Sequence, residues 1–229
     1  MKTLAILILI LGFSICVDGQ NATVKSLGET EGRLFLPDGV DFEDEVPERL
    51  QYMFADFIEG AVYYEDGDSL TDIKLNVSLL DRKVYCADST GHVRIVPGHN
   101  HIDNLIIGEY HLIRHGKNFV IFLASYGKTM LIHKTELHVA FQYKVSGINY
   151  SSRIHPGRYA YYALEAGYAL TRGRKEILVD AETFRKVFPK VKWQIDEYLM
   201  ENDVDYENEE DVMKFFEYCS DMDKKLRTL

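Results

Sequence analysis

The sequence predicts an α+β protein in which an antiparallel β-meander, curled or partly closed into a barrel, is followed by two or three C-terminal helices. Between residues 55 and 179, apolar residues mostly recur with a period of two, as in strands whose successive side chains point to opposite faces. From Asp180 onward the period changes to that of a helix. A sheet followed by helices is typical of the α+β class.

Composition and charge limit the classes of protein to consider. The chain has 229 residues, of which 46% are apolar and 27% charged, with only 5 prolines. This composition is typical of a folded globular chain large enough to need no disulfide scaffold. The net charge of -10 argues against nucleic-acid binding through one broad basic surface, because counterion release requires clustered Lys and Arg.

Residues 1–19 have the pattern of a secretory signal peptide. Lys2 supplies a positive charge, residues 4–13 form an almost unbroken apolar run, and small residues precede a cleavage position ahead of Gln20. The run is short for a bilayer span, and no later segment approaches the roughly 20 apolar residues that a membrane helix needs. We therefore expect an exported protein, periplasmic or secreted, without a membrane span.

Three segments should follow the signal peptide. Residues 20–54 are mixed and acidic, which indicates a loosely ordered lead-in. Residues 55–179 should form the β-rich domain, and residues 180–229 a helical segment packed on it. The lead-in contains the turn signal Pro37-Asp38-Gly39.

Strands are expected wherever apolar and polar residues alternate. Ile73 to Val77, Val93 to Ile95 and Leu137 to Tyr143 show this pattern and should be half-buried strands. Turn residues punctuate the region at short intervals, which favours hairpins, and we expect about seven to nine strands up to residue 143. Residues 119–124 are apolar on both faces and should form a central strand.

After residues 147–157, which break the alternation, the pattern resumes from Tyr159 to Val179. It indicates two or three further short strands that turn near Gly167 and Gly173.

Three helices are expected at the C-terminus. Asp180 is a good N-cap for the first helix, which Pro189 ends; the same proline can open the second helix, with Asn202 as its stop. Asn208 should cap a last helix that starts near Glu209. Its expected buried residues are Val212, Phe215, Phe216, Cys219 and Met222.

Two cysteines, Cys86 and Cys219, remain after signal cleavage. An oxidising compartment would allow them to form a disulfide. Cys86 also alternates with Val84 in a strand pattern, and Cys219 lies on an apolar helical stripe, so each can equally be a small buried hydrophobic residue. The sequence leaves both interpretations open.

Three segments resemble a group of exported, uncharacterised proteins of Bacteroidota. They are Phe57 to Tyr64 followed by Asp66-Gly67, Ile73 to Val77 leading to Lys83-Val84-Tyr85, and the close from Phe184 through Phe216-Glu217-Tyr218. The resemblance covers most of the mature chain. It implies a bacterial envelope or secreted location and a sheet followed by helices. The group has no established activity, so the resemblance assigns no catalytic residue.

Candidate chemistry is sparse. His99, His101 and Asp103 form the densest group of potential metal ligands, but a polar turn after Pro97-Gly98 explains them more simply, and we assign no metal or other cofactor. His111 and His115 would share a strand face about 13 Å apart, which is too far for joint ligation. The chain has neither a Gly-x-Ser-x-Gly elbow nor a His-Glu-x-x-His helix, and we assign no catalytic residue.

Charge and tyrosine offer two further hypotheses. Residues 172–192 have a local net charge of +4, and residues 196–229 have one of -8. Solvated helix faces of opposite charge explain this difference. The alternative is that one charged patch docks an oppositely charged partner. Tyrosines gather at Tyr159, Tyr161, Tyr162 and Tyr168. They would mark a carbohydrate or peptide surface if several share one exposed face, whereas tyrosine on strands mostly packs with a wet hydroxyl.

The leading hypothesis for function is a non-enzymatic binding or structural accessory module of the bacterial envelope, with a protein or glycan partner. It rests on the export signal together with the lack of a recognisable catalytic motif in the sequence. The alternative is a hydrolase whose acid and base converge only in the fold. That alternative predicts a deep pocket lined by two or more carboxylates or by a His-carboxylate pair.

Overall fold

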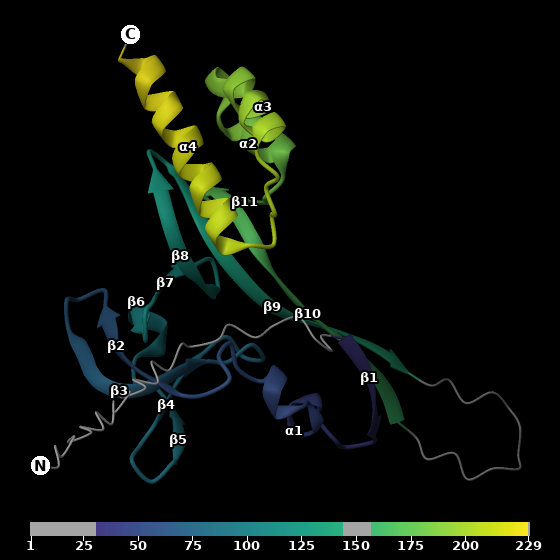
Figure 1. The fold of residues 1–229 in the computed structure, drawn as a ribbon. Coiled ribbons are helices and arrows are strands. Elements are labelled where there is room, and N and C mark those ends of the chain that lie inside the picture. The colour runs from purple at the N-terminus through teal and green to yellow at the C-terminus, as the bar shows by residue number, and fades with distance from the viewer. Residues whose placement is uncertain (1–30, 144–156, 229) are drawn as a thin grey trace, which may run out of the picture.

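The computed structural model describes residues 31–143 and 157–228. Within them, eleven antiparallel strands form one curled sheet that does not close, and helices follow at the C-terminus (Figure 1). The strands are β1 (Glu31–Pro37), β2 (Ile58–Tyr64), β3 (Ser69–Val77), β4 (Val84–Ala87), β5 (Val93–Ile95), β6 (Ile102–Ile107), β7 (Tyr110–His115), β8 (Asn118–Tyr126), β9 (Thr129–Tyr143), β10 (Gly157–Arg172) and β11 (Lys175–Leu178). The predicted α+β class is confirmed.

The strand order shows how two meanders share one sheet. It runs β1-β10-β9-β8-β7-β6-β2-β3-β4-β5, and β11 pairs with β10 beyond the end of β1. The strands from β6 to β10 are sequential neighbours, as are those from β2 to β5, but β6 pairs with β2 instead of β5. A buried face explains this choice, because Ile102, Leu105 and Ile107 of β6 are fully buried, whereas every residue of β5 is exposed.

That exposure corrects one expectation. Val93 to Ile95 forms a strand as predicted, but the strand is not half-buried: it lies at the edge of the sheet and pairs only with β4. Alternation predicted the strand correctly, but it could not show that the side chains of Val93 and Ile95 are both exposed at the sheet edge.

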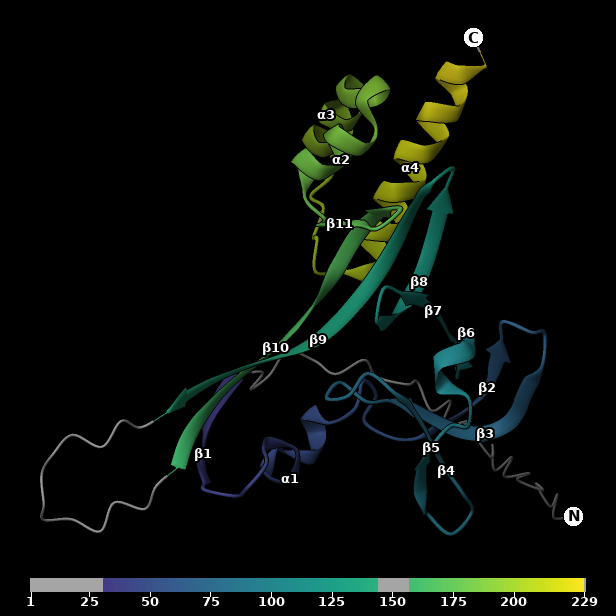
Figure 2. The ribbon, with the colours of Figure 1, turned by 180° about the vertical axis from the view of Figure 1, so that it is seen from behind.

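The longest feature is the ribbon of β9 and β10, which runs from the helices to β1 at the other end of the molecule (Figures 1 and 2). Its register is unbroken from Arg158↔Tyr143 to Arg172↔Thr129. The expected turn near Gly173 is present, but the one near Gly167 is not, because Gly167 pairs with Lys134 inside β10. The predicted short strands are therefore one long strand and β11.

The structure also differs from the expected loose lead-in. Residues 31–54 contain β1, the short helix α1 (Phe42–Glu45) and the 3-10 helix η1 (Glu48–Leu50). Although this segment is rich in acidic residues, six of its apolar residues are buried in the hydrophobic core: Leu36, Phe42, Val46, Leu50, Met53 and Phe54. The side chain of Asn76 on β3 holds this segment by accepting a hydrogen bond from the Phe54 amide (3.1 Å) and donating to the Phe54 carbonyl (3.0 Å).

The C-terminal helices follow the prediction closely. They are α2 (Ala181–Val187), the 3-10 turn η3 (Pro189–Val191), α3 (Lys192–Glu201) and α4 (Glu209–Arg227). Asp180 accepts a hydrogen bond from the Thr183 amide, and Asn208 accepts one from the Asp211 amide, so both predicted N-caps are formed.

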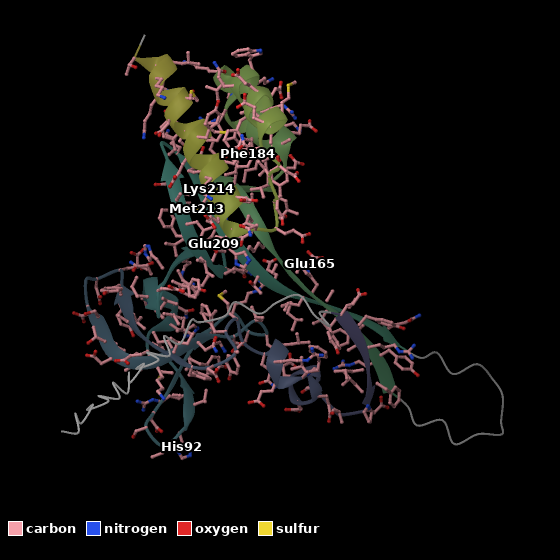
Figure 3. The ribbon with its side chains drawn as sticks, viewed as in Figure 1. His92, Glu165, Phe184, Glu209, Met213 and Lys214 are labelled. Carbon is pink, nitrogen blue, oxygen red and sulfur yellow. The ribbon has the colours of Figure 1, made fainter. Side chains whose placement is uncertain are left out.

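Two main hydrophobic clusters stabilise the fold. The first packs against β1 to β8 and the β1 end of β9 and β10, and it includes Cys86. The second joins the helices to β8, β9 and β10 at the other end of the ribbon and includes Cys219. Figure 3 shows Phe184 among the helices of the second cluster, away from the curled sheet that holds the first. Both cysteines are buried free thiols. The structure therefore does not contain the disulfide that the sequence allowed, and each cysteine packs as a small hydrophobic residue.

The predicted signal peptide, residues 1–19, lies outside the described residues. No helix within residues 31–143 and 157–228 is long and apolar enough to cross a membrane.

Candidate functional site

A cavity of about 590 Å³ lies on the ribbon where β11 adjoins β10. Its charged lining consists of Lys134, Glu136, Glu165 and Glu176, which we call the carboxylate pocket. The labelled Glu165 lies along the ribbon between the helices and β1 (Figure 3). A volume of this size is typical of small-molecule sites.

The strand register explains why these side chains meet. Lys134 and Glu136 are two residues apart on β9 and so share one face. Glu165 pairs directly with Glu136, and Gly167 pairs with Lys134, so no side chain covers the lysine from β10. The turn at Gly173 then folds β11 back along β10 and brings Glu176 to the same place.

Lys134 is the centre of the carboxylate pocket. Its Nζ lies 2.7 Å from Oε1 of Glu176 and 3.0 Å from Oε2 of Glu136, and all three side chains are largely buried. Burial alone would lower the pKa of Lys134, but its hydrogen bonds to the two glutamates outweigh that effect and raise the pKa above its usual value. The lysine therefore stays charged and ties β11 to β9.

Two histidines extend the network. His115 Nε2 lies 3.7 Å from Glu176 Oε2, and His138 Nε2 lies 3.3 Å from Glu165 Oε2. The Asn118 side-chain amide also donates a hydrogen bond to Glu136. The pocket therefore holds the carboxylates that the hydrolase alternative predicts, and two histidines contact those carboxylates without lining the pocket.

The same network limits the chemistry available. A general acid or base must be able to exchange its proton with a substrate at the site. Glu136 and Glu176 already share the Lys134 ammonium, and Asn118 occupies the other oxygen of Glu136. The arrangement is therefore better suited to fastening strands, or to polar recognition, than to proton transfer.

A second surface lies at the far end of the ribbon. Phe35 on β1 pairs directly with Tyr159 on β10, and Tyr161 is two residues further along the same face of β10. We call these three residues the aromatic face. Phe35 is 41% exposed and Tyr161 is 40% exposed. Of the four tyrosines in the carbohydrate or peptide hypothesis, only Tyr161 is exposed, and Phe35 supplies the second exposed ring on this face.

Polar groups surround these rings. The guanidinium of Arg33 lies 4.8 Å from the centre of the Tyr159 ring, and the Tyr161 hydroxyl donates to Gln142 Oε1 over 3.1 Å. The Phe35 and Tyr159 rings contact each other with centroids 5.2 Å apart. The aromatic face thus combines ring surface with hydrogen-bonding groups at its border.

Other tyrosines in the predicted group have packing roles. Tyr162 points to the opposite face and is buried in the first cluster. Tyr168 packs on His133, with ring centroids 4.9 Å apart. Only Tyr159 and Tyr161 of the four belong to the aromatic face, because they alone among the four combine odd-numbered positions on β10 with a place beside β1.

The histidines singled out from the sequence are not gathered into a ligand set. His99 and His101 lie in a 3-10 turn, and His101 approaches Glu65 at 3.8 Å. His111 and His115 both lie on β7 as expected; His111 contacts the Phe122 ring. Within the part of the chain that the structure describes, no group of three or more His, Cys, Asp or Glu side chains could hold a metal ion.

Sequence reasoning missed the carboxylate pocket. A signal was present, since Lys134, Glu136 and His138 alternate along one strand face. What the sequence could not supply was Glu176, which reaches them only because β10 continues straight through Gly167 before the chain turns.

Comparison of the chain with protein-family models, with curated proteins and with solved structures gives no match. The resemblance to exported proteins of Bacteroidota stays a prediction, and function has to be argued from geometry alone.

Proposed function

We propose that the protein is a non-enzymatic, exported module of the bacterial envelope that binds a glycan through the aromatic face. The observation that carries this proposal is that Phe35, Tyr159 and Tyr161 lie on one face of β1 and β10, where Phe35 and Tyr161 are exposed and Tyr159 is partly buried. Exposed aromatic rings bordered by a few polar groups are typical of sites that recognise small ligands.

A glycan fits this surface better than a protein does. A stable protein interface buries about 800 Å² on each partner, and three rings on two strands offer much less. A sugar ring needs only an aromatic platform for its apolar side and donors for its hydroxyls. The Arg33 guanidinium lies at the border of the rings and can serve as a donor, and the oxygen of the Tyr161 hydroxyl, whose hydrogen goes to Gln142, can accept from a sugar hydroxyl.

Affinity measurements on variants test the proposal. The full mature chain should bind at least one polysaccharide in a panel of bacterial envelope glycans and peptidoglycan, and Tyr161→Ala should weaken that binding about tenfold. Tyr63→Ala is the matched control, because Tyr63 on β2 is equally exposed, at 39%, but lies outside the aromatic face. A control that weakens binding as much as Tyr161→Ala, or the absence of glycan binding, would contradict the proposal.

Hydrolase activity at the carboxylate pocket is the second candidate, although the ion pairs of Lys134 fit proton transfer less well than a fastening role. Its support is the proximity of Glu136 and Glu176 to the same ammonium, with His115 and His138 beside them. Purified protein incubated with the same polysaccharides should then release reducing ends, and Glu136→Gln should abolish the release while Glu182→Gln on the exposed side of α2 should not. Turnover with this pattern would replace the non-enzymatic proposal.

A further inference from the structure

A separate cavity of about 430 Å³ lies between the β8–β9 hairpin, the junction of α2 and η3, and the C-terminal part of α4. Tyr126 and Phe188 form its aromatic wall, with ring centroids 6.1 Å apart in a stacked arrangement. Its charged lining consists of Lys128, Arg172, Lys190, Arg227 and Asp223, which we call the basic pocket.

The only carboxylate in that lining is already satisfied. Asp223 is 3% exposed, and its Oδ2 accepts hydrogen bonds from the Tyr126 hydroxyl at 2.9 Å and from Arg227 Nε at 2.6 Å. These bonds fasten α4 to β8 and neutralise one arginine against one aspartate. Asp223 is therefore not available to balance the other cations of the basic pocket.

Three cations remain without compensation. Lys128 lies in the hairpin turn, Arg172 ends β10 and Lys190 lies in η3. None of the three has an ion-pair partner among residues 31–143 and 157–228. Like charges gathered around one cavity repel each other, and in a chain of net charge -10 this concentration is unusual.

We propose that the basic pocket binds a small anion that carries two or more negative charges, with the chemistry of a phosphate or sulfate ester. Arginine and lysine donate charge-assisted hydrogen bonds to such oxyanions. The cavity has the volume of a small-molecule site, too small for a folded domain or a duplex. The aromatic wall of Tyr126 and Phe188 can contact the organic part of an ester.

This proposal does not depend on the aromatic face. The basic pocket lies at the helical end of the ribbon, and β1 lies at the other end (Figure 2). Loss of glycan binding at the aromatic face would leave anion binding intact, and the converse also holds. The two proposals can therefore fail separately.

Titration calorimetry with inorganic pyrophosphate, and separately with sulfate, tests the proposal on the full mature chain, with sodium chloride of equal ionic strength as the salt control. We expect heat of binding and a raised melting temperature with at least one oxyanion and neither with chloride, since a ligand that binds only the folded state stabilises it. Binding of pyrophosphate alone would identify phosphate esters as the ligand class, and binding of sulfate alone would identify sulfate esters.

Charge-removing variants locate the site. Lys190→Gln and Arg172→Gln should each weaken oxyanion binding about tenfold, the effect of one lost hydrogen bond between charged groups. Lys128→Gln, in a hairpin turn, repeats the test without touching a helix. Lys117→Gln is the control, because Lys117 is exposed and lies in the turn at the opposite end of β8.

The variants remain folded if their circular dichroism spectra match that of the wild type, which we expect because all four side chains are exposed. Equal weakening by Lys117→Gln would show nonspecific attraction and overturn the proposal. Absence of any oxyanion binding by the wild type, beyond that of chloride, would overturn it as well.

Discussion

Single buried polar residues hold distant parts of this fold together. Asn76 has no exposed surface, and its side-chain oxygen accepts from the Phe54 amide and from the Val77 amide (2.9 Å), while its nitrogen donates to the carbonyls of Phe54 and Asp56. The oxygen and the nitrogen of this side-chain amide therefore make all the hydrogen bonds that they can. Asn76 thereby joins β3 to the segment that follows η1.

Asn76→Ala should lower the free energy of unfolding by about 3 kcal/mol, because it leaves several buried backbone groups without partners. Urea denaturation monitored by circular dichroism measures the change. Asn104→Ala is the matched control, because the partly exposed Asn104 side chain on β6 donates to the adjacent Asp103, which is not a buried backbone group. A loss at Asn76 no larger than that at Asn104 would show that the lead-in segment does not depend on this side chain.

His133 makes stability depend on pH. It is buried beside Tyr168, and desolvation lowers the pKa of its imidazole to about 4 in the folded protein, against about 6.5 when unfolded. Between these two values only the unfolded chain takes up the proton, so stability is complete above about pH 6.5 and falls as the pH drops toward 4.

We expect the free energy of unfolding to fall by about 1.4 kcal/mol per pH unit from this group within that window. His133→Phe keeps a ring against Tyr168 and removes the titrating group. Urea denaturation at pH 7.0 and pH 5.5 should therefore show a smaller loss of stability for His133→Phe than for the wild type. Equal losses would mean that His133 is protonated in the folded state as readily as in the unfolded state.

At the scale of elements, two glycines in strands have opposite surroundings. A Cβ on Gly60 of β2 would overlap the backbone carbonyl oxygen of Ile106 on the adjoining β6. A Cβ on Gly167 of β10 would meet only the Leu178 side chain, at an ordinary contact distance of 3.9 Å. The first glycine allows two strands to approach closely, and the second leaves the carboxylate pocket open.

Gly60→Ala should therefore destabilise the protein by about 3 kcal/mol, since backbone cannot move away as a flexible side chain can. Gly167→Ala should leave the free energy of unfolding unchanged or raise it by a few tenths of a kcal/mol. Thermal unfolding of both variants checks the pair. Equal destabilisation by the two variants would contradict the inference that Gly60, and not Gly167, is needed for a close approach between strands.

The sequence predicted helices better than strand partners. Caps at Asp180 and Asn208, together with the proline at position 189, are local signals, and they placed all three helices correctly. The length of β10 and the pairing of β6 with β2 depend on contacts between distant residues, which no local pattern encodes. Glu176 was not predicted as a site residue, because its place beside Lys134 likewise depends on contacts between distant residues.

At the scale of the whole molecule, the two main hydrophobic clusters are nearly independent. The first gathers residues of the curled sheet, and the second gathers the helices against the end of the ribbon; Leu123 of β8 packs against both. Fully buried residues of one cluster are therefore surrounded mostly by residues of their own cluster.

Val84→Ala in the first cluster and Val212→Ala in the second should each lower the free energy of unfolding by about 2 kcal/mol. The double variant should equal the sum of the two within about 0.5 kcal/mol, as expected for sites without shared partners. Chemical denaturation of the two single variants and the double variant gives the coupling. A coupling well above that limit would show that the ribbon transmits packing changes between the clusters.

The pairing of β1 with β10 sets an order of events during folding. Phe35 pairs with Tyr159, so the ribosome releases β1 long before its partner exists, whereas the hairpins from β6 to β9 can close as soon as they are made. Closing so large a loop is slow. Pulse-labelling hydrogen exchange during refolding should find the β1 amides protected after those of β8. The reverse order would show that β1 becomes protected before the hairpins form, and it would contradict this order of folding.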